Sequence, residues 1–140
     1  MIEAETAVKA EAWAEKFRQA TKSDPVIQCY VKYYSYAKYY TCDFLLDMED
    51  LRVGVQMRDG QIHKIEINPA PLEPHHFSLH APAETWRKMS EKHPKPFFHG
   101  FWAASVREDL RIEGDITVLM QNLRNFTAQF ELFRQIGVPV

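Results

Sequence analysis

The sequence has 140 residues, a formal net charge of −2 and two cysteines. This length fits one domain with a proper hydrophobic core and is too short for two independent ones. A negative net charge does not attract phosphate groups. The first residues do not have the pattern of a secretory signal peptide, and no stretch is apolar enough to span a bilayer. We therefore expect a cytoplasmic protein with no nucleic acid partner and no stable membrane insertion.

Two helices are predicted at the start of the chain. Residues 3–20 contain no glycine or proline, and their apolar residues recur at three- and four-residue steps. These residues are Ala10, Trp13, Phe17 and Ala20. Asp24 and Pro25 then indicate the cap and first turn of a second helix that runs to about residue 37.

Alternation of apolar and polar residues predicts a meander of three antiparallel strands, over residues 40–48, over 51–57 and around Ile65 and Ile67. Asp59 and Gly60 form the second turn. A strict two-residue loop would place Val55 opposite Lys64, whereas a left-handed bulge at Gly60 would place it opposite Ile65. We predict the bulge.

The sequence after the meander predicts several short elements and a long last helix. An extended, proline-rich connection precedes a strand over residues 77–80, and Pro82 starts a helix bearing Trp86 that His93 and Pro94 stop. Residues 97–106 are expected to be helical, and residues 110–113 form the last strand. Asp115 caps a single terminal helix that ends at Gly137. Its apolar stripe consists of Ile116, Leu119, Met120, Leu123, Phe126, Phe130 and Phe133.

This order of elements, with the stretch Leu110-Arg111-Ile112-Glu113-Gly114-Asp115, resembles the sterol carrier protein type two (SCP2-like) family. In that family a similar Leu-Lys-Ile-x-Gly-Asp stretch follows an apolar segment that looks like residues 97–102 here and precedes the closing helix. Trp86 also stands where those domains often carry a tryptophan. The resemblance covers roughly residues 23–136. Residues 1–22 would then be a helical extension of a single domain over residues 1–140.

The resemblance implies an α+β fold, with a five-stranded, largely antiparallel sheet covered mainly on one face by helices. It also implies a lipid-sized tunnel between sheet and helices that binds fatty acyl chains, sterols or similar molecules without catalysis or a cofactor. A large supply of apolar side chains in the second half of the chain suits such a site. The residues expected to line it are Trp86, Phe97, Phe98, Phe101, Trp102, Leu119, Met120, Leu123, Phe126 and Phe130.

Polar contacts to such a ligand would come from tyrosine or histidine. All six tyrosines lie between residues 30 and 40, so some of them face outward or line a cavity. Tyr33, Tyr40 and His99 are the candidates for a hydrogen bond to a ligand hydroxyl or carbonyl. Surface packing of the tyrosines, or a homodimer contact, explains the same pattern.

Two other function classes remain as alternatives. One is an enzyme or enzyme accessory acting on an aromatic or steroid-like substrate, with His63 or His99 as an acid-base group. The other is a structural dimerisation domain without a tunnel. We find no nucleophile with a base and no phosphate-binding loop, and solvation explains Asp43 and Asp47. His75 and His76 are adjacent on an extended chain and point apart, so we expect no metal there.

Overall fold

The computed structural model describes residues 2–25, 41–58, 61–70, 73–94, 96, 98, 100–107 and 109–140. Residues 26–37 of the second predicted helix, the tyrosines and Gly60 lie outside these residues. The elements are α1 (Ile2–Ser23), β1 (Cys42–Asp47), β2 (Arg52–Arg58), β3 (Gln61–Ile67), β4 (Phe77–His80), α3 (Ala83–Met89), α4 (Phe101–Arg107), β5 (Arg111–Gly114), α5 (Ile116–Gln121), α6 (Leu123–Glu131) and α7 (Phe133–Ile136).

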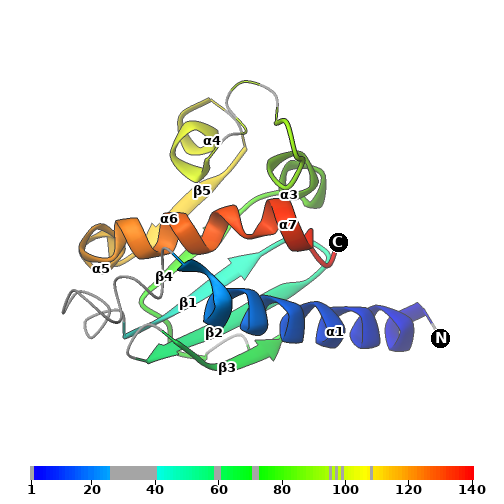
Figure 1. Ribbon diagram of the computed structural model, residues 1–140. Coiled ribbons are helices and arrows are strands. Elements are labelled where there is room, and N and C mark those ends of the chain that lie inside the picture. Colours follow the sequence, from blue (N-terminus) through cyan, green and yellow to red (C-terminus); the bar gives the residue numbers. More distant parts are fainter. Residues whose placement is uncertain are drawn as a thin grey trace.

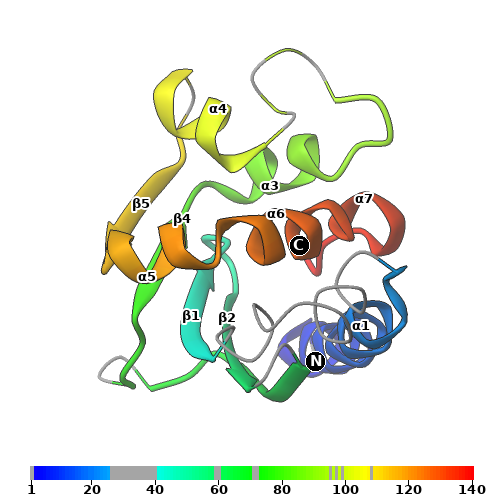
Figure 2. The ribbon, with the colours of Figure 1, turned by 60° about the vertical axis from the view of Figure 1, so that its left-hand side comes forward.

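The strands form one mixed sheet in the order β3-β2-β1-β4-β5, in which only β1 and β4 are parallel to each other as neighbours. Helices α1, α5, α6 and α7 lie along one face of this sheet, with α1 beside β3 (Figure 1). The predicted α+β fold with a largely antiparallel, five-stranded sheet is therefore confirmed. Figure 2 shows α3 and α4 beyond α6, on the side away from α1.

Alternation along the strands separates the two faces of the sheet, as the sequence predicts. The residues that point toward the helices are buried: Cys42, Phe44, Leu46, Val53, Val55, Met57, Phe77 and Leu79. The stripe of α1 packs onto the same layer, because Ala10, Trp13 and Phe17 are buried. The core therefore lies between one face of the sheet and the helices.

The register of the hairpin between β2 and β3 is partly as predicted. Val55 pairs with Ile65, which confirms the expected shift of one residue. Arg58 pairs with Gln61 and Met57 with Ile62, and the shift comes between Gln56 and Met57. The extra residue is thus His63, inside β3, so the predicted position of the bulge was wrong. An irregularity within the strand leaves the pairs beside the turn intact.

The helical boundaries also differ from the prediction. Helix α3 ends at Met89, before the His93-Pro94 stop, and α4 begins only at Phe101. The terminal helix is three helices, with breaks at Asn122 and Leu132. At the first break, the buried Asn122 side chain donates to the Val118 carbonyl, 3.0 Å away, and competes with the regular backbone ladder.

Candidate apolar binding site

Four of the predicted site residues form a buried aromatic cluster between α3, α4 and α6. The Phe101 ring lies 5.0 Å from Phe126 and 5.5 Å from Phe130, centroid to centroid. The Trp86 ring lies 6.0 Å from Phe130. All four side chains are almost completely buried. Rings at these separations gain both burial and edge-to-face attraction, so this part of the prediction describes a real apolar layer.

The cluster extends onto the sheet and toward α1. Phe126 stands edge-on to Phe44 of β1 and Phe77 of β4, at 5.2 and 5.3 Å. On the other side, Phe130 contacts Phe133, whose ring also contacts Trp86 and the α1 residues Trp13 and Phe17. Rings therefore pack in an unbroken series across the layer where the tunnel was expected. A ligand that lies in this layer must displace rings.

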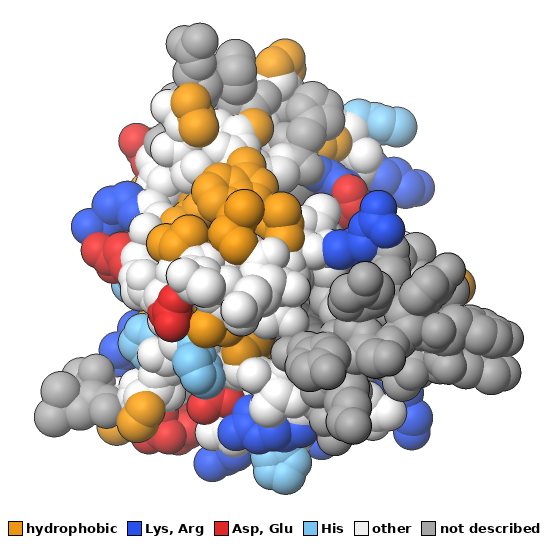
Figure 3. All heavy atoms as spheres, turned by 90° about the vertical axis from the view of Figure 1, so that its left-hand side faces the viewer, with side chains coloured by type: hydrophobic (Ala, Val, Ile, Leu, Met, Phe, Trp, Pro, Cys, Tyr) orange, Lys and Arg blue, Asp and Glu red, His pale blue; other side chains and the backbone are white. Residues whose placement is uncertain are grey.

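Two predicted tunnel residues lie at the surface instead. Trp102 is 39% exposed and Met120 is 52% exposed, together with Ile116 at 39% and Val106 at 75%. These four residues of α4 and α5 are called the α4–α5 patch below. Figure 3 shows apolar side chains gathered on this side of the molecule, with charged side chains around them. The placement of Met120 and Ile116 in the buried stripe was wrong, because α5 presents only Leu119 to the core as a fully buried residue.

The remaining predicted site residues take different positions. Leu119 is buried and Leu123 is half-buried against the core. Phe98 is buried, and the Lys88 ammonium lies 5.4 Å from the centre of its ring. Four further predicted residues lie outside the described part of the chain: Tyr33, Tyr40, Phe97 and His99.

The α4–α5 patch is continuous with the buried cluster. The rings of Phe101 and Trp102 lie 5.4 Å apart, although Phe101 is buried and Trp102 reaches the surface. Apolar side chains thus run from the surface at Trp102 of α4 to the centre of the core.

Comparisons with known proteins match the chain by structure and not by sequence. No family profile and no curated protein matches it. Among solved structures, it superposes on crystalline sterol carrier protein 2 with a TM-score of 0.66 and 15% identity, over 89% of this chain and 95% of that one. TT1886 from Thermus thermophilus, a conserved hypothetical protein described as a candidate sterol carrier protein, gives 0.63 and 19%, over 91% and 88%. The UbiJ-SCP2 ubiquinone synthesis protein gives 0.57 and 11%, over 92% and 93%.

The chain has the SCP2-like fold. Each superposition covers most of both chains, so the likeness concerns the whole domain and not one shared motif. At these identities it establishes the fold alone. Within the described residues, no helix is long and apolar enough to cross a membrane.

Structural roles explain the motif that carries the family resemblance. Gly114 has φ +96°, and a Cβ at this position would lie 2.6 Å from the His76 carbonyl oxygen. Asp115 donates its backbone N–H to that same carbonyl at 2.7 Å. Its side chain accepts hydrogen bonds from Thr117 and Val118, which caps α5. In this structure the Gly-Asp pair therefore joins α5 to the start of β4.

A polar cluster lies on the opposite face of the sheet, at an open hollow. His80 places Nδ1 2.9 Å from Asp47 and Nε2 2.8 Å from both Glu113 and Ser78. Although Ser78, His80 and Asp47 are the residue types of a hydrolase triad, Ser78 is buried and offers no accessible nucleophile. Asp47 and Glu113 contact different ring nitrogens, so the three residues do not converge on one ion. Solvation was the wrong explanation for Asp47.

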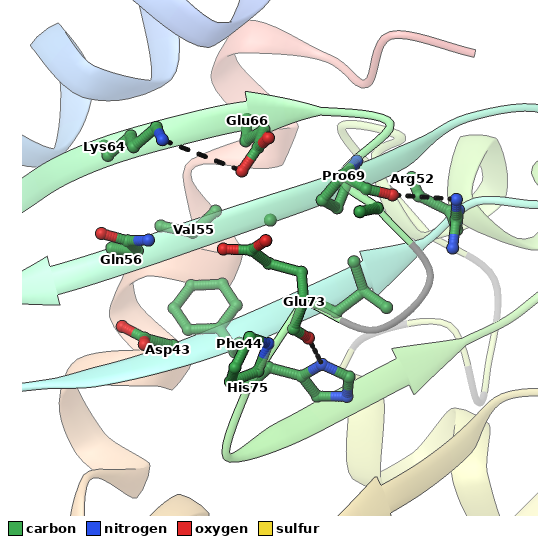
Figure 4. A pocket seen from close by; sticks show the side chains of 14 residues that line it. Asp43, Phe44, Arg52, Val55, Gln56, Lys64, Glu66, Pro69, Glu73 and His75 are labelled. Atoms are coloured by element: carbon green, nitrogen blue, oxygen red, sulfur yellow. Dashed lines mark hydrogen bonds and ion pairs between the residues drawn. The ribbon is translucent and has the colours of Figure 1, made fainter.

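The same face carries a narrow crevice between the strands and the connection after β3 (Figure 4). Pro69 and Glu73 cover β1 and β2 there, and Arg52 donates to the Pro69 carbonyl at 3.0 Å. The crevice holds about 30 Å³, which suits one or two water molecules and no lipid. At its side, Asp43 forms an ion pair with Arg58 at 2.8 Å, so Asp43 is paired and not merely solvated.

Proposed function

We propose that this SCP2-like domain binds an apolar small molecule of lipid size, such as a fatty acyl chain or a sterol, in the layer between α6 and the sheet. Two of its structural neighbours are described as sterol carrier proteins, one of them as a candidate, and the third as a ubiquinone synthesis protein. The observation that carries the proposal is the contact between the exposed α4–α5 patch and the buried aromatic cluster.

Binding requires the ring cluster to open, since its rings are in contact without the ligand. A ligand replaces ring-to-ring contacts by ring-to-ligand contacts of the same kind, and it removes its own apolar surface from water. The removal of the ligand's apolar surface from water contributes about 25 cal/mol of binding free energy for each Å². The α4–α5 patch adds to the binding free energy, because the Trp102 and Met120 side chains are also removed from water when a molecule covers them. The net driving force is therefore hydrophobic and needs no catalytic group.

The direct test is a titration of the purified protein with a fluorescent fatty acid and a fluorescent sterol. We expect saturable binding of at least one probe at one site per chain. Native mass spectrometry of the same protein shows whether a lipid stays bound during purification. Absence of saturable binding for both probes, with no mass above that of the polypeptide, would contradict the proposal.

A further inference from the structure

Three buried amide side chains belong to α6 and the residue just before it: Asn122, Asn125 and Gln129. Their spacing of three and four residues puts them on a common helix face. A primary amide has two polar atoms, and each needs a hydrogen-bond partner when water is excluded. The partners of the three amides can therefore be compared directly.

Two of these amides have partners. Asn122 donates to the Val118 carbonyl at 3.0 Å. Gln129 places Nε2 3.4 Å from Thr21 Oγ1 of α1 and 3.4 Å from Met57 Sδ of β2. Because Gln129 reaches both α1 and the sheet, this helix face points into the buried layer and not toward solvent.

Asn125 differs from its neighbours. It is 5% exposed, and its Oδ1 is inaccessible to solvent and accepts no hydrogen bond within the described residues. The next residue, Phe126, belongs to the aromatic cluster and contacts Phe44, Phe77 and Phe101. An amide oxygen without a partner thus lies at the margin of the layer proposed to hold the ligand. Such a group costs free energy until a donor reaches it.

We infer that Asn125 binds the hydroxyl group of the apolar ligand, an inference that rests on the proposed function. A hydroxyl group has a proton that it can donate to Oδ1. An ionised fatty acid has no proton to donate to Oδ1. The ligand class is therefore a hydrocarbon with a single hydroxyl, such as a long-chain alcohol or a sterol.

The test compares two probes of equal size, 1-decanol and 1-methoxynonane, by isothermal titration calorimetry. Both have the same number of non-hydrogen atoms, but only the alcohol can donate a hydrogen bond. In Asn125→Leu, we expect the preference for the alcohol over the ether to fall about tenfold relative to the wild type, the effect of one buried hydrogen bond. Asn122→Leu is the matched control, because it removes a neighbouring buried amide and leaves the preference unchanged.

Each outcome separates the inference from the proposed function. If both probes bind and Asn125→Leu leaves the preference unchanged, the inference is overturned and the proposed function stands. If neither probe binds the wild type although the fluorescent fatty acid or sterol does, the inference fails and the proposed function stands. If the fluorescent probes do not bind either, both fail. The melting temperature of ligand-free Asn125→Leu should equal or exceed that of the wild type, since an unpartnered polar group is replaced by an apolar one. Asn125→Ala is the second variant if the leucine does not fold.

Discussion

At the scale of single residues, the contact between Gly114 and His76 is the tightest backbone approach around the described glycines. It holds β5 against β4 and places Asp115 to cap α5. No residue with a Cβ fits here without moving the backbone of His76 and Phe77, because the obstructing atoms are the main-chain carbonyl oxygen of His76 and the Cα of Phe77. The glycine requirement therefore has a steric cause and not only a conformational one.

Three glycine substitutions separate these causes. Gly100→Ala meets no atom of the described residues within 4 Å and should change the free energy of unfolding by less than about 0.5 kcal/mol. Gly137→Ala adds only the strain of φ +76°, about 1–3 kcal/mol. Gly114→Ala combines strain with the steric clash and should cost about 3–5 kcal/mol. Denaturant unfolding measures all three, and equal losses at Gly114 and Gly137 would rule out the steric part.

The Cys42 thiol gives a pH-dependent prediction. Burial raises its pKa from 9.0 to about 12, and the charge of Asp43 adds to the shift while Arg58 opposes it. In a Cys29→Ser background, the folded protein should react with a thiol reagent at pH 8 only as fast as it unfolds. The unfolded chain loses this proton first, so stability should fall as the pH rises from about 9 to 12. Thiolate reactivity in the native state at pH 8 would contradict this.

At the scale of elements, α1 is joined to the end of the chain. The Trp13 indole N–H donates to the Gly137 carbonyl at 2.7 Å, and its ring stacks on Phe17 and contacts Phe133. The helix also packs along the edge strand β3. We therefore propose that α1, the helical extension of the single domain that the family resemblance implies, is part of the folding unit.

Substitution of Trp13 tests this attachment. Trp13→Phe keeps an aromatic ring but leaves the Gly137 carbonyl without its donor, so we expect a loss of about 1 kcal/mol. Trp13→Ala also removes the ring contacts and should lose about 3–5 kcal/mol. Unfolding followed by far-ultraviolet circular dichroism should show one transition in each variant. A separate early transition for α1 would contradict its place in the folding unit.

At the scale of the whole molecule, the SCP2-like fold puts apolar material in two places with different consequences. The aromatic cluster is buried and stabilises the domain, whereas the α4–α5 patch exposes side chains that contribute little to stability. The two are linked through Phe101 and Trp102. Under the proposed function, the patch should control how fast a ligand enters, and the cluster how tightly it is held.

A charged patch variant tests that division. Val106→Glu combined with Met120→Glu alters only exposed side chains, so the free energy of unfolding should change by less than about 1 kcal/mol. The association rate of a fluorescent fatty acid should fall about tenfold in stopped-flow measurements, because charges at the entrance repel an anionic apolar probe. Val8→Glu is the control, since Val8 is equally apolar and 71% exposed but lies on α1. Equal rates in all three proteins would place the entrance elsewhere.

The sequence by itself determined the elements whose side chains repeat with a clear period. The strands, the buried stripe of α1 and the Asp115 cap were all predictable, because each depends on neighbours within a few residues along the chain. The register of Val55 opposite Ile65 was also predictable, since a shift of one residue would turn the apolar side chains of β3 outward.

Only the tertiary structure decided where the bulge, the helix breaks and the exposed residues lie. Ile116 and Met120 follow the same helical period as Leu119, but no described element covers them. Asn125 is polar in sequence and buried in the fold for the converse reason, because the helix face that it shares with Gln129 packs against α1 and the sheet. Whether a side chain is buried depends on which elements pack against each other, and residues distant in sequence determine that packing.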